Sequence, residues 1–196
     1  CLERMKEIPD GSVDMILTDP PYGTTACKWD SIIPLEPMWE QLKRVIKPNG
    51  AIVITASQPF TTTLIASNME MFKYCWYWKK SRPSGHVNAK LKPLKDIEDI
   101  TVFSSGATAN GSVRNMPYYP QGLEDCNYNY ERKNINITYS GTSPQRKNSG
   151  KKRVIDKKGY PRQVLEYSMH NVGQLHPTQK PVALMEYLIK TYTNEA

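Results

Sequence analysis

Four consecutive residues, Asp19-Pro20-Pro21-Tyr22, combine a carboxylate, two prolines and an aromatic ring. They directly follow the apolar run 13–17 (VDMIL), which two prolines cannot continue as a sheet strand. Neither proline has an N–H group, so the segment presents hydrogen-bond acceptors: main-chain carbonyls and the Asp19 carboxylate. Such a surface suits a planar –NH2 group, and Tyr22 offers a flat face on which an attached ring can stack. Adenine and cytosine carry such a group; a plain proline-rich turn is the alternative.

The segment 107–175 carries most of the positive charge of the chain. It holds eleven lysine and arginine residues and five acids, so it contributes +6 (11 − 5) to a net charge of +7. Seven tyrosines and eight asparagines accompany them, with little helical or strand periodicity. Cations bind phosphates, whereas Asn and Tyr contact bases and sugars, so this composition favours duplex DNA as a partner. A solvated loop is the alternative. The cations expected to contact DNA are Arg146, Lys147, Lys151, Lys152, Arg153, Lys157, Lys158 and Arg162.

Strand and helix patterns alternate on either side of this basic segment. Apolar runs predict strands at 13–17, 51–56, 73–78 and 99–103. One-sided apolar spacing predicts helices over 34–46 and 60–67, and a third that begins near Pro181. Such alternation is typical of an α/β fold with a parallel-rich sheet. Ligands of such sheets bind beyond the carboxyl ends of the strands, where residues 19–22 are expected.

Length, hydrophobicity and cysteine content exclude several classes of protein. With 196 residues, 39% of them hydrophobic, the chain can form one domain with a sizeable core. No apolar run approaches the ~20 residues of a membrane span and no signal peptide opens the sequence, so we expect a cytoplasmic protein without a membrane partner. His170 and His176 are six residues apart, a poor spacing for a shared ion, so we expect no metal. The cysteines form no CxxC pair and are expected as free thiols: Cys1, Cys27, Cys75 and Cys126.

Three motifs, taken in their order along the chain, resemble one enzyme family. They are DPPYG (19–23) after an apolar strand, the basic segment, and HPTQKPVALMEYLIK (176–190). Together they resemble the DNA amino-methyltransferases that use S-adenosylmethionine (SAM), and their order is similar to that of the β group. The stretches GTTACKWD (23–30) and WKKSRPSG (78–85) are similar to phage and prophage members. The resemblance implies a Rossmann-like methyltransferase sheet with helices on both faces and a basic, irregular target-recognition insert, in a bacterial or phage-encoded protein.

The same resemblance implies roles for particular residues. Asp19 and the Pro20 carbonyl would accept the two amino hydrogens of an adenine flipped out of the duplex. Pro21 completes the motif, and Tyr22 would stack on the base. SAM would be the only cofactor, with no metal. The residues that the resemblance assigns to SAM binding are Asp19, His176, Thr178, Lys180 and Pro181.

The resemblance also divides the chain into three parts. Residues 1–106 would form the catalytic core, 107–175 the target-recognition insert, and 176–196 the return to the core with a helix at the cofactor edge. The family's glycine-rich SAM loop is expected after residue 196, and no substitute for it stands elsewhere in the sequence. We therefore expect this chain by itself to bind SAM weakly.

Three alternative functions share these motifs. Cytosine carries the same exocyclic amino group, but Asp19 stands where cytosine enzymes of the family more often have Ser, which favours adenine. A glutamine amide in a protein presents the same two N–H donors, although such a substrate does not require a basic insert. A DNA-binding remnant without catalytic activity is the third alternative. Besides duplex DNA, two partners stay open: a second copy of the chain and a cognate restriction nuclease.

Overall fold

The computed structural model of the chain describes residues 2–25, 27, 30–131, 152–169 and 179–194. The chain divides into two compact units. The first comprises Cys1–Tyr119 together with Arg162–Ala196, and the second is Pro120–Pro161. The second unit is thus shorter at both ends than the insert expected at 107–175.

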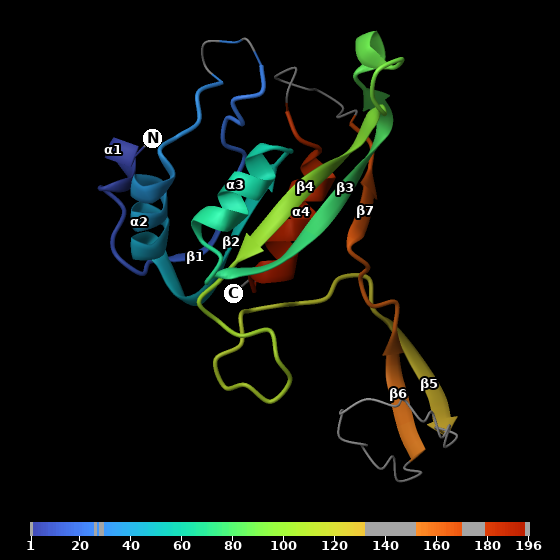
Figure 1. Cartoon of the computed structure of the whole chain (residues 1–196). Coiled ribbons are helices and arrows are strands. Elements are labelled where there is room, and N and C mark those ends of the chain that lie inside the picture. Colours follow the sequence, from blue (N-terminus) through green and yellow to red (C-terminus); the bar gives the residue numbers. More distant parts are fainter. Residues whose placement is uncertain (1, 26, 28–29, 132–151, 170–178, 195–196) are drawn as a thin grey trace, which may run out of the picture. The chain divides into compact units, whose positions relative to one another are not determined.

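A five-stranded sheet forms the centre of the first unit (Figure 1). Its order is β1-β2-β4-β3-β7, and the bounds are β1 Val13–Thr18, β2 Ile46–Ala56, β3 Phe72–Ser84, β4 Lys95–Phe103 and β7 Val164–Tyr167. The β1–β2 and β3–β7 pairs are parallel, whereas β4 runs antiparallel to both of its neighbours. The sheet is therefore mixed, and the expectation of a parallel-rich sheet is wrong for β4. The reason is that β4 follows β3 through a short connection instead of a crossover helix, so the two strands pair antiparallel.

Helices pack on both faces of this sheet, as the sequence predicted. One face is covered by α2 (Leu35–Val45) and α3 (Phe60–Ser67), with the short α1 (Leu2–Met5) beside α2. The other face is covered by α4 (Val182–Tyr192). Each helix presents apolar residues at helical spacing. In α2 these buried residues are Met38, Trp39, Leu42 and Val45.

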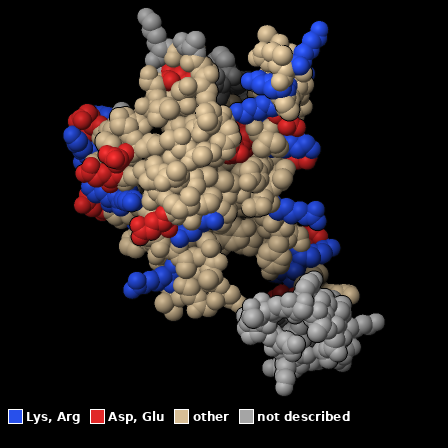
Figure 2. All heavy atoms as spheres, viewed as in Figure 1, with Lys and Arg blue, Asp and Glu red and all other residues tan. Residues whose placement is uncertain are grey.

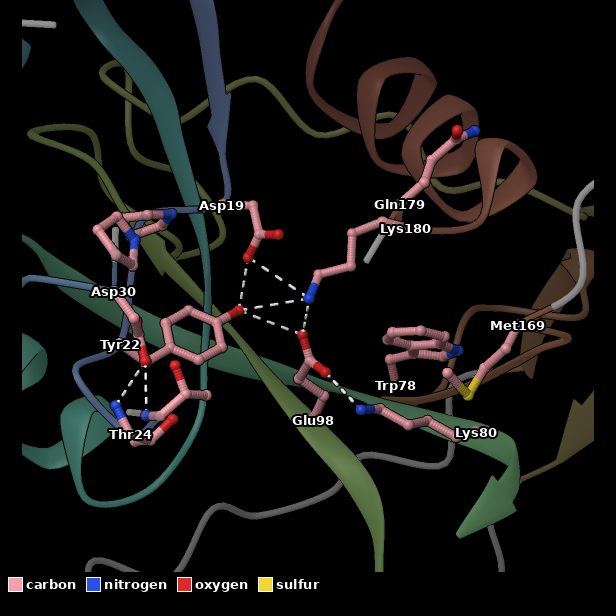
Figure 3. Close-up of a pocket in the computed structure, with 13 residues that line it drawn as sticks. Asp19, Tyr22, Thr24, Asp30, Trp78, Lys80, Glu98, Met169, Gln179 and Lys180 are labelled. Atoms are coloured by element: carbon pink, nitrogen blue, oxygen red, sulfur yellow. Dashed lines mark hydrogen bonds and ion pairs between the residues drawn. The ribbon is translucent and has the colours of Figure 1, made fainter. Parts of the chain in front are cut away.

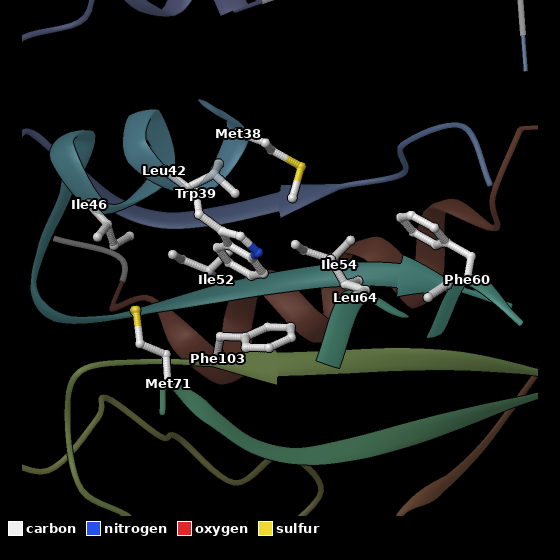
Figure 4. Packing of buried hydrophobic residues seen from close by; sticks show 11 residues of the cluster. Met38, Trp39, Leu42, Ile46, Ile52, Ile54, Phe60, Leu64, Met71 and Phe103 are labelled. Atoms are coloured by element: carbon white, nitrogen blue, oxygen red, sulfur yellow. The ribbon is translucent and has the colours of Figure 1, made fainter. Parts of the chain in front are cut away.

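Strand β2 lies in the interior of the sheet and separates two hydrophobic clusters. Successive side chains of a strand point to opposite faces. Ile52 and Ile54 accordingly join the cluster under α2 and α3 (Figure 4), and Ala51 and Val53 join the cluster under α4. All four are fully buried. Because β2 is apolar on both faces, its sequence reads as one continuous hydrophobic run.

Helix α4 is fixed to the sheet by a buried tyrosine as well as by apolar contacts. Leu184 and Leu188 are fully buried in the second cluster. The Tyr192 hydroxyl accepts a hydrogen bond from Trp76 Nε1 at 2.7 Å and lies 2.9 Å from the Tyr74 hydroxyl. The helix that carries the residues after HPTQKP is therefore fixed at its last turn to the middle of β3.

The second unit contains one antiparallel hairpin, β5 (Glu124–Glu131) and β6 (Lys152–Lys158). The sequence predicted no regular structure here. Strand β7 also lies inside the expected insert 107–175, but it pairs with β3 in the sheet of the first unit. Four residues, Val164–Tyr167, are too short a run to produce a periodic sequence signal.

Candidate active site

The acceptor turn, residues 19–22, lies directly after β1, at the edge where the parallel strands β1 and β2 both end (Figure 3). It lines a cavity of about 450 Å³, a volume within the range of small-molecule sites. The described lining residues come from the turn and the loop after it, from β3 and β4, and from the segments that follow β7 and precede α4. They are Asp19, Pro20, Pro21, Tyr22, Thr24, Thr25, Asp30, Trp78, Lys80, Glu98, Met169, Gln179 and Lys180.

Asp19 is held through one of its two carboxylate oxygens. Its Oδ1 accepts hydrogen bonds from the Tyr22 hydroxyl at 2.6 Å and the Thr55 hydroxyl at 2.5 Å. Lys180 Nζ lies 3.4 Å from the same oxygen. Thr55 reaches it because β2 runs parallel to β1 and ends beside the turn. Within the described part of the chain all these contacts end on Oδ1, so Oδ2 is left for a ligand.

Glu98, in β4, is a buried carboxylate at the same cavity, 5% exposed. Its Oε2 lies 2.7 Å from Lys80 Nζ, and its Oε1 forms an ion pair with Lys180. Burial by itself would raise the pKa of Glu98, but the charges of the two lysines outweigh it and hold the pKa below its ordinary value. Lys180 therefore bridges two carboxylates, those of Glu98 and Asp19.

The Tyr22 ring lines the cavity and has Phe60 and Lys180 as neighbours. It stacks on Phe60, with 5.6 Å between ring centroids and 21° between ring planes. Lys180 Nζ lies 5.6 Å from the ring centroid and 3.5 Å from the hydroxyl, so the ammonium group sits toward the hydroxyl end of the ring. Burial, with the charges of Glu98 and Asp19, raises the pKa of Tyr22 far above 10. The hydroxyl therefore stays protonated, and it remains a hydrogen-bond donor to Asp19.

The loop after the turn is folded around a second carboxylate. Asp30 accepts the backbone N–H groups of Gly23 at 2.9 Å, Thr24 at 2.9 Å and Thr25 at 2.7 Å. A bond from the Thr25 side chain, and after it the three main-chain bonds, lower the pKa of Asp30 to about 2, so it is ionised throughout the physiological range. Gly23 has a φ of +65°, and a Cβ there would lie 2.8 Å from Ile32 Cγ1, so the sharp turn requires glycine.

The structure brings together most of the catalytic residues predicted from sequence. The acceptor turn and Lys180, which is 161 residues away from Asp19 (180 − 19), line one cavity. Pro181 is buried at the N-terminus of α4 and is not among the lining residues that the structure describes. His176 and Thr178 lie outside the described residues.

The predicted DNA-binding cations are less fully described. Arg146, Lys147 and Lys151 lie outside the described residues, and so do the side chains of Lys152 and Arg153, which belong to β6. Lys157 and Lys158 are in β6 as well, and Arg162 follows in the first unit. Both β6 lysines form ion pairs across the hairpin, Lys157 with Asp125 at 2.6 Å and Lys158 with Glu124 at 3.0 Å.

Sequence reasoning assigned no role to several residues of the site, among them Thr55, Trp78, Lys80 and Glu98. Thr55 has a recognisable signal, since it is the polar residue near the end of the run AIVITA, beside the predicted acceptor turn. The signal of Glu98 is weaker, because an acid inside KDIEDITVF looks like the polar boundary of a strand. Trp78 and Glu98 meet at the cavity because β3 and β4 pair antiparallel with these two residues opposite each other. A single-strand sequence pattern does not reveal that pairing.

Comparison with known proteins agrees with this geometry. A family model described as DNA methylase, the N6/N4 methyltransferases, matches residues 13–196. The chain belongs to this DNA methylase family. The match covers β1 with its acceptor turn, the whole sheet and α4.

Relatives with known names or structures belong to the same class of DNA methylases. The type II methyltransferase M.HpaI of Haemophilus parainfluenzae is 24% identical over 212 aligned residues, which include 100% of this chain and 58% of M.HpaI. The crystal structure of the M1.HpyAVI–SAM complex is 21% identical, with a TM-score of 0.54 over 98% of this chain and 72% of the other. The cytosine-N4-specific PvuII DNA methyltransferase is 12% identical, with a TM-score of 0.59 over 98% and 68%.

These comparisons establish the methyltransferase fold. The chain spans 58% of the length of M.HpaI, a curated relative that it matches. In the part that the structure describes, no three metal-ligating side chains come together, and no helix is long and apolar enough to cross a membrane.

Proposed function

We propose that this chain carries the catalytic site of a DNA methyltransferase that transfers a methyl group from SAM to the exocyclic amino nitrogen of adenine in duplex DNA. One observation carries the proposal: Asp19 and Pro20 line the cavity, and the described donors to Asp19 all bind Oδ1, so Oδ2 is left as an acceptor beside the Pro20 residue. The N–H donors of an amino group are the natural complement of this surface.

The acceptors serve a chemical purpose in this reaction. The lone pair of an aryl amine is conjugated with its ring, which makes the nitrogen a poor nucleophile. When the nitrogen attacks, it becomes pyramidal and positively charged, and its hydrogens become better donors. Hydrogen bonds to Oδ2 of Asp19 and to the Pro20 carbonyl therefore strengthen toward the transition state and lower the barrier.

Tyr22 and Lys180 hold these acceptors in place. The hydroxyl of Tyr22 and the ammonium group of Lys180 fix Asp19 Oδ1, so the carboxylate needs no reorganisation during the reaction. The Tyr22 ring lines the cavity and provides a stacking surface for the base, worth ~1–3 kcal/mol. The base has to leave the duplex first, at a cost of a few kcal/mol.

The charges of the cavity fit the proposed cofactor. Its described lining residues include three carboxylates, Asp19, Asp30 and Glu98, and two ammonium groups, Lys80 and Lys180, a net charge of −1 (2 − 3). A negative cavity favours a cationic ligand. SAM supplies an electrophilic methyl group on a sulfonium cation, and Lys180 and Pro181, together with Asp19, are the described residues assigned to hold it.

Adenine is the proposed base because Asp19 stands where related cytosine enzymes more often carry serine. Cytosine remains the second candidate, since it presents the same amino group and the cytosine-N4-specific PvuII enzyme shares the fold. We further propose that the second unit, with the flanking residues of 107–175, recognises the target sequence. A second copy of the chain and a restriction nuclease remain predicted partners.

The test is methyl transfer from radiolabelled SAM to duplex DNA, with the product nucleosides separated by chromatography. N6-methyldeoxyadenosine is expected; N4-methyldeoxycytidine would correct the base, and label in protein instead of DNA would overturn the proposal. Asp19→Asn keeps the shape of the side chain but replaces one acceptor with a donor. It should lower the transfer rate ~100-fold or more while duplex affinity changes by a few fold, because phosphate contacts dominate affinity.

Asp14→Asn is the matched control for this substitution. Asp14 lies in β1, the strand that leads into the acceptor turn, and is exposed, with Lys47 Nζ 2.6 Å from its Oδ1. Its variant should methylate DNA at the unaltered rate. Retention of more than about a tenth of the transfer rate by Asp19→Asn would contradict the role of the acceptor turn.

A further inference from the structure

The connection between β3 and β4 is strongly basic. Residues 79–95, the basic arm, comprise the end of β3, the short helix η1 (His86–Asn88) and the first residue of β4. The arm contains six lysine and arginine residues and no acid. The net charge outside 107–175 is only +1, because acids elsewhere in the chain offset these cations. The arm therefore has as much excess charge as the whole expected insert, in a quarter of its length.

Only two of these six cations form an ion pair with an acid in the described part of the chain. Lys79 pairs with Glu166, Lys80 pairs with Glu98, and Lys95 donates a hydrogen bond to Ser57. The other three, Arg82, Lys90 and Lys92, form no ion pair with any residue that the structure describes. The segment from Ser81 to Lys95 is exposed at every position, and Figure 2 shows Lys and Arg side chains gathered over this part of the surface.

Two apolar side chains lie between these cations and are nearly fully exposed. Val87 is 99% exposed and Leu91 is 85% exposed. Exposed apolar side chains do not stabilise a loop that is surrounded only by water. Their exposure among unpaired cations is typical of a surface that a polyanion with apolar sugars and bases covers.

The arm is connected directly to the catalytic cavity. Trp78 and Lys80 line the cavity, and β3 continues from Lys80 to Ser84, which pairs with Lys95. Four strand residues span about 13 Å, which corresponds to about four phosphate steps of one DNA strand. The unpaired cations thus begin within a few nucleotides of any base that enters the cavity.

We infer that the basic arm binds the phosphates of duplex DNA that flank the extruded nucleotide. The inference rests on the proposed function, because it takes the cavity as the site of that nucleotide. It adds a DNA contact to the catalytic unit itself, separate from the expected insert. In the hairpin of that insert, Lys157 and Lys158 are already paired with acids, whereas the arm has free cations.

The experiment measures the affinity of the full chain for a target duplex as a function of salt. The arm variant is Arg82→Gln/Lys90→Gln/Lys92→Gln. The control is Arg4→Gln/Lys6→Gln/Lys43→Gln, which removes the same charge from α1, the residue that follows it and α2, at the opposite side of the view in Figure 1. The slope of log K against log salt should fall by about 2–3 units in the arm variant and stay within about one unit in the control. Target and non-target duplexes should be affected alike.

Each outcome has a distinct meaning. An arm variant with the slope of the unaltered chain would overturn the inference and leave the proposed function intact. A loss of slope in both variants would indicate a general field effect of net charge, which also overturns the inference. If the unaltered chain binds no duplex at all, the proposed function fails together with the inference. All six side chains are exposed, so both variants should melt within a few degrees of the unaltered chain. Such melting temperatures would exclude misfolding as the cause of a changed slope.

Discussion

Tyr22 has a single hydroxyl hydrogen and faces two carboxylates. The hydroxyl oxygen lies 2.6 Å from Asp19 Oδ1 and 3.2 Å from Glu98 Oε1, so the hydrogen goes to Asp19. Glu98 does not need it, because Lys80 and Lys180 already neutralise its charge. Glu98 thus fixes Lys180 through an ion pair, and Lys180 in turn holds Asp19.

A prediction about pH follows from this buried ion pair. The pKa of Glu98 is held below its ordinary 4.5 in the folded chain. Between that folded value and 4.5 the unfolded chain binds more protons, so the pair's stabilisation is full above about pH 4.5 and is lost as the pH falls. Glu98→Gln leaves two buried lysines without a counter-charge and should cost roughly 3–5 kcal/mol at neutral pH. Urea unfolding from pH 7 to about pH 3 should show this cost shrinking toward acid.

Glu186→Gln is the control for this measurement. The pKa of Glu186 is also lowered, by its bond to Lys190, but the pair lies on the exposed face of α4 and is screened by solvent. Its variant should follow the unaltered chain at every pH. A cost of Glu98→Gln that is the same at pH 3 and pH 7 would mean that the lysines do not depend on the charge of Glu98.

Among the helices and strands, the sequence best predicted those in which burial imposes a regular pattern of apolar residues. Helix α2 has a one-sided apolar face and was found within one residue of its bounds. Strand β2 is apolar on both faces from residue 51 onward and was found there, but its first five residues, 46–50, were not predicted as strand. The acceptor turn was found because two prolines must end β1. Strand β3 was predicted to end at Trp78, because its next six residues (KKSRPS) are polar. Pairing with β4 keeps that polar stretch in the sheet, and no local pattern encodes such pairing.

The loop after the turn provides a prediction at this scale. Asp30 alone accepts the amides of Gly23, Thr24 and Thr25, so Asp30→Ala should leave these three N–H groups without their acceptor. Their hydrogen exchange should become ~10-fold faster or more, because bonds to a charged acceptor are among the stronger ones. NMR exchange of the three amides is the measurement. Amides within β2 serve as the internal reference and should exchange as before; unchanged rates at the three loop amides would show that the loop is held by other contacts.

At the scale of the whole molecule, the site depends on the docking of α4. Lys180 is positioned because the helix that follows it packs on the sheet through Leu184, Leu188 and Tyr192. The Tyr192 hydroxyl also satisfies the indole N–H of Trp76, which is 3% exposed. Burial raises the pKa of Tyr192 above its ordinary range, so the phenol is neutral and no charge is buried there.

Removal of this one hydroxyl should weaken the whole first unit. Tyr192→Phe leaves the buried Trp76 N–H without an acceptor, which costs ~1–3 kcal/mol in the free energy of unfolding. Tyr160→Phe, at a tyrosine that is 61% exposed, should change it by less than ~0.5 kcal/mol. Urea unfolding followed by tryptophan fluorescence measures both. Equal stabilities of the two variants would mean that α4 is held by its leucines alone.

The 161 residues that separate Asp19 from Lys180 also set an order of events during translation. Synthesis proceeds at about 5–20 residues per second, so Lys180 is made roughly 10–30 s after the acceptor turn. During that interval the nascent chain has its carboxylates and Tyr22 but not the ammonium group that bridges them. The proposed activity therefore begins only after Lys180 has been synthesised and α4 has docked on the sheet.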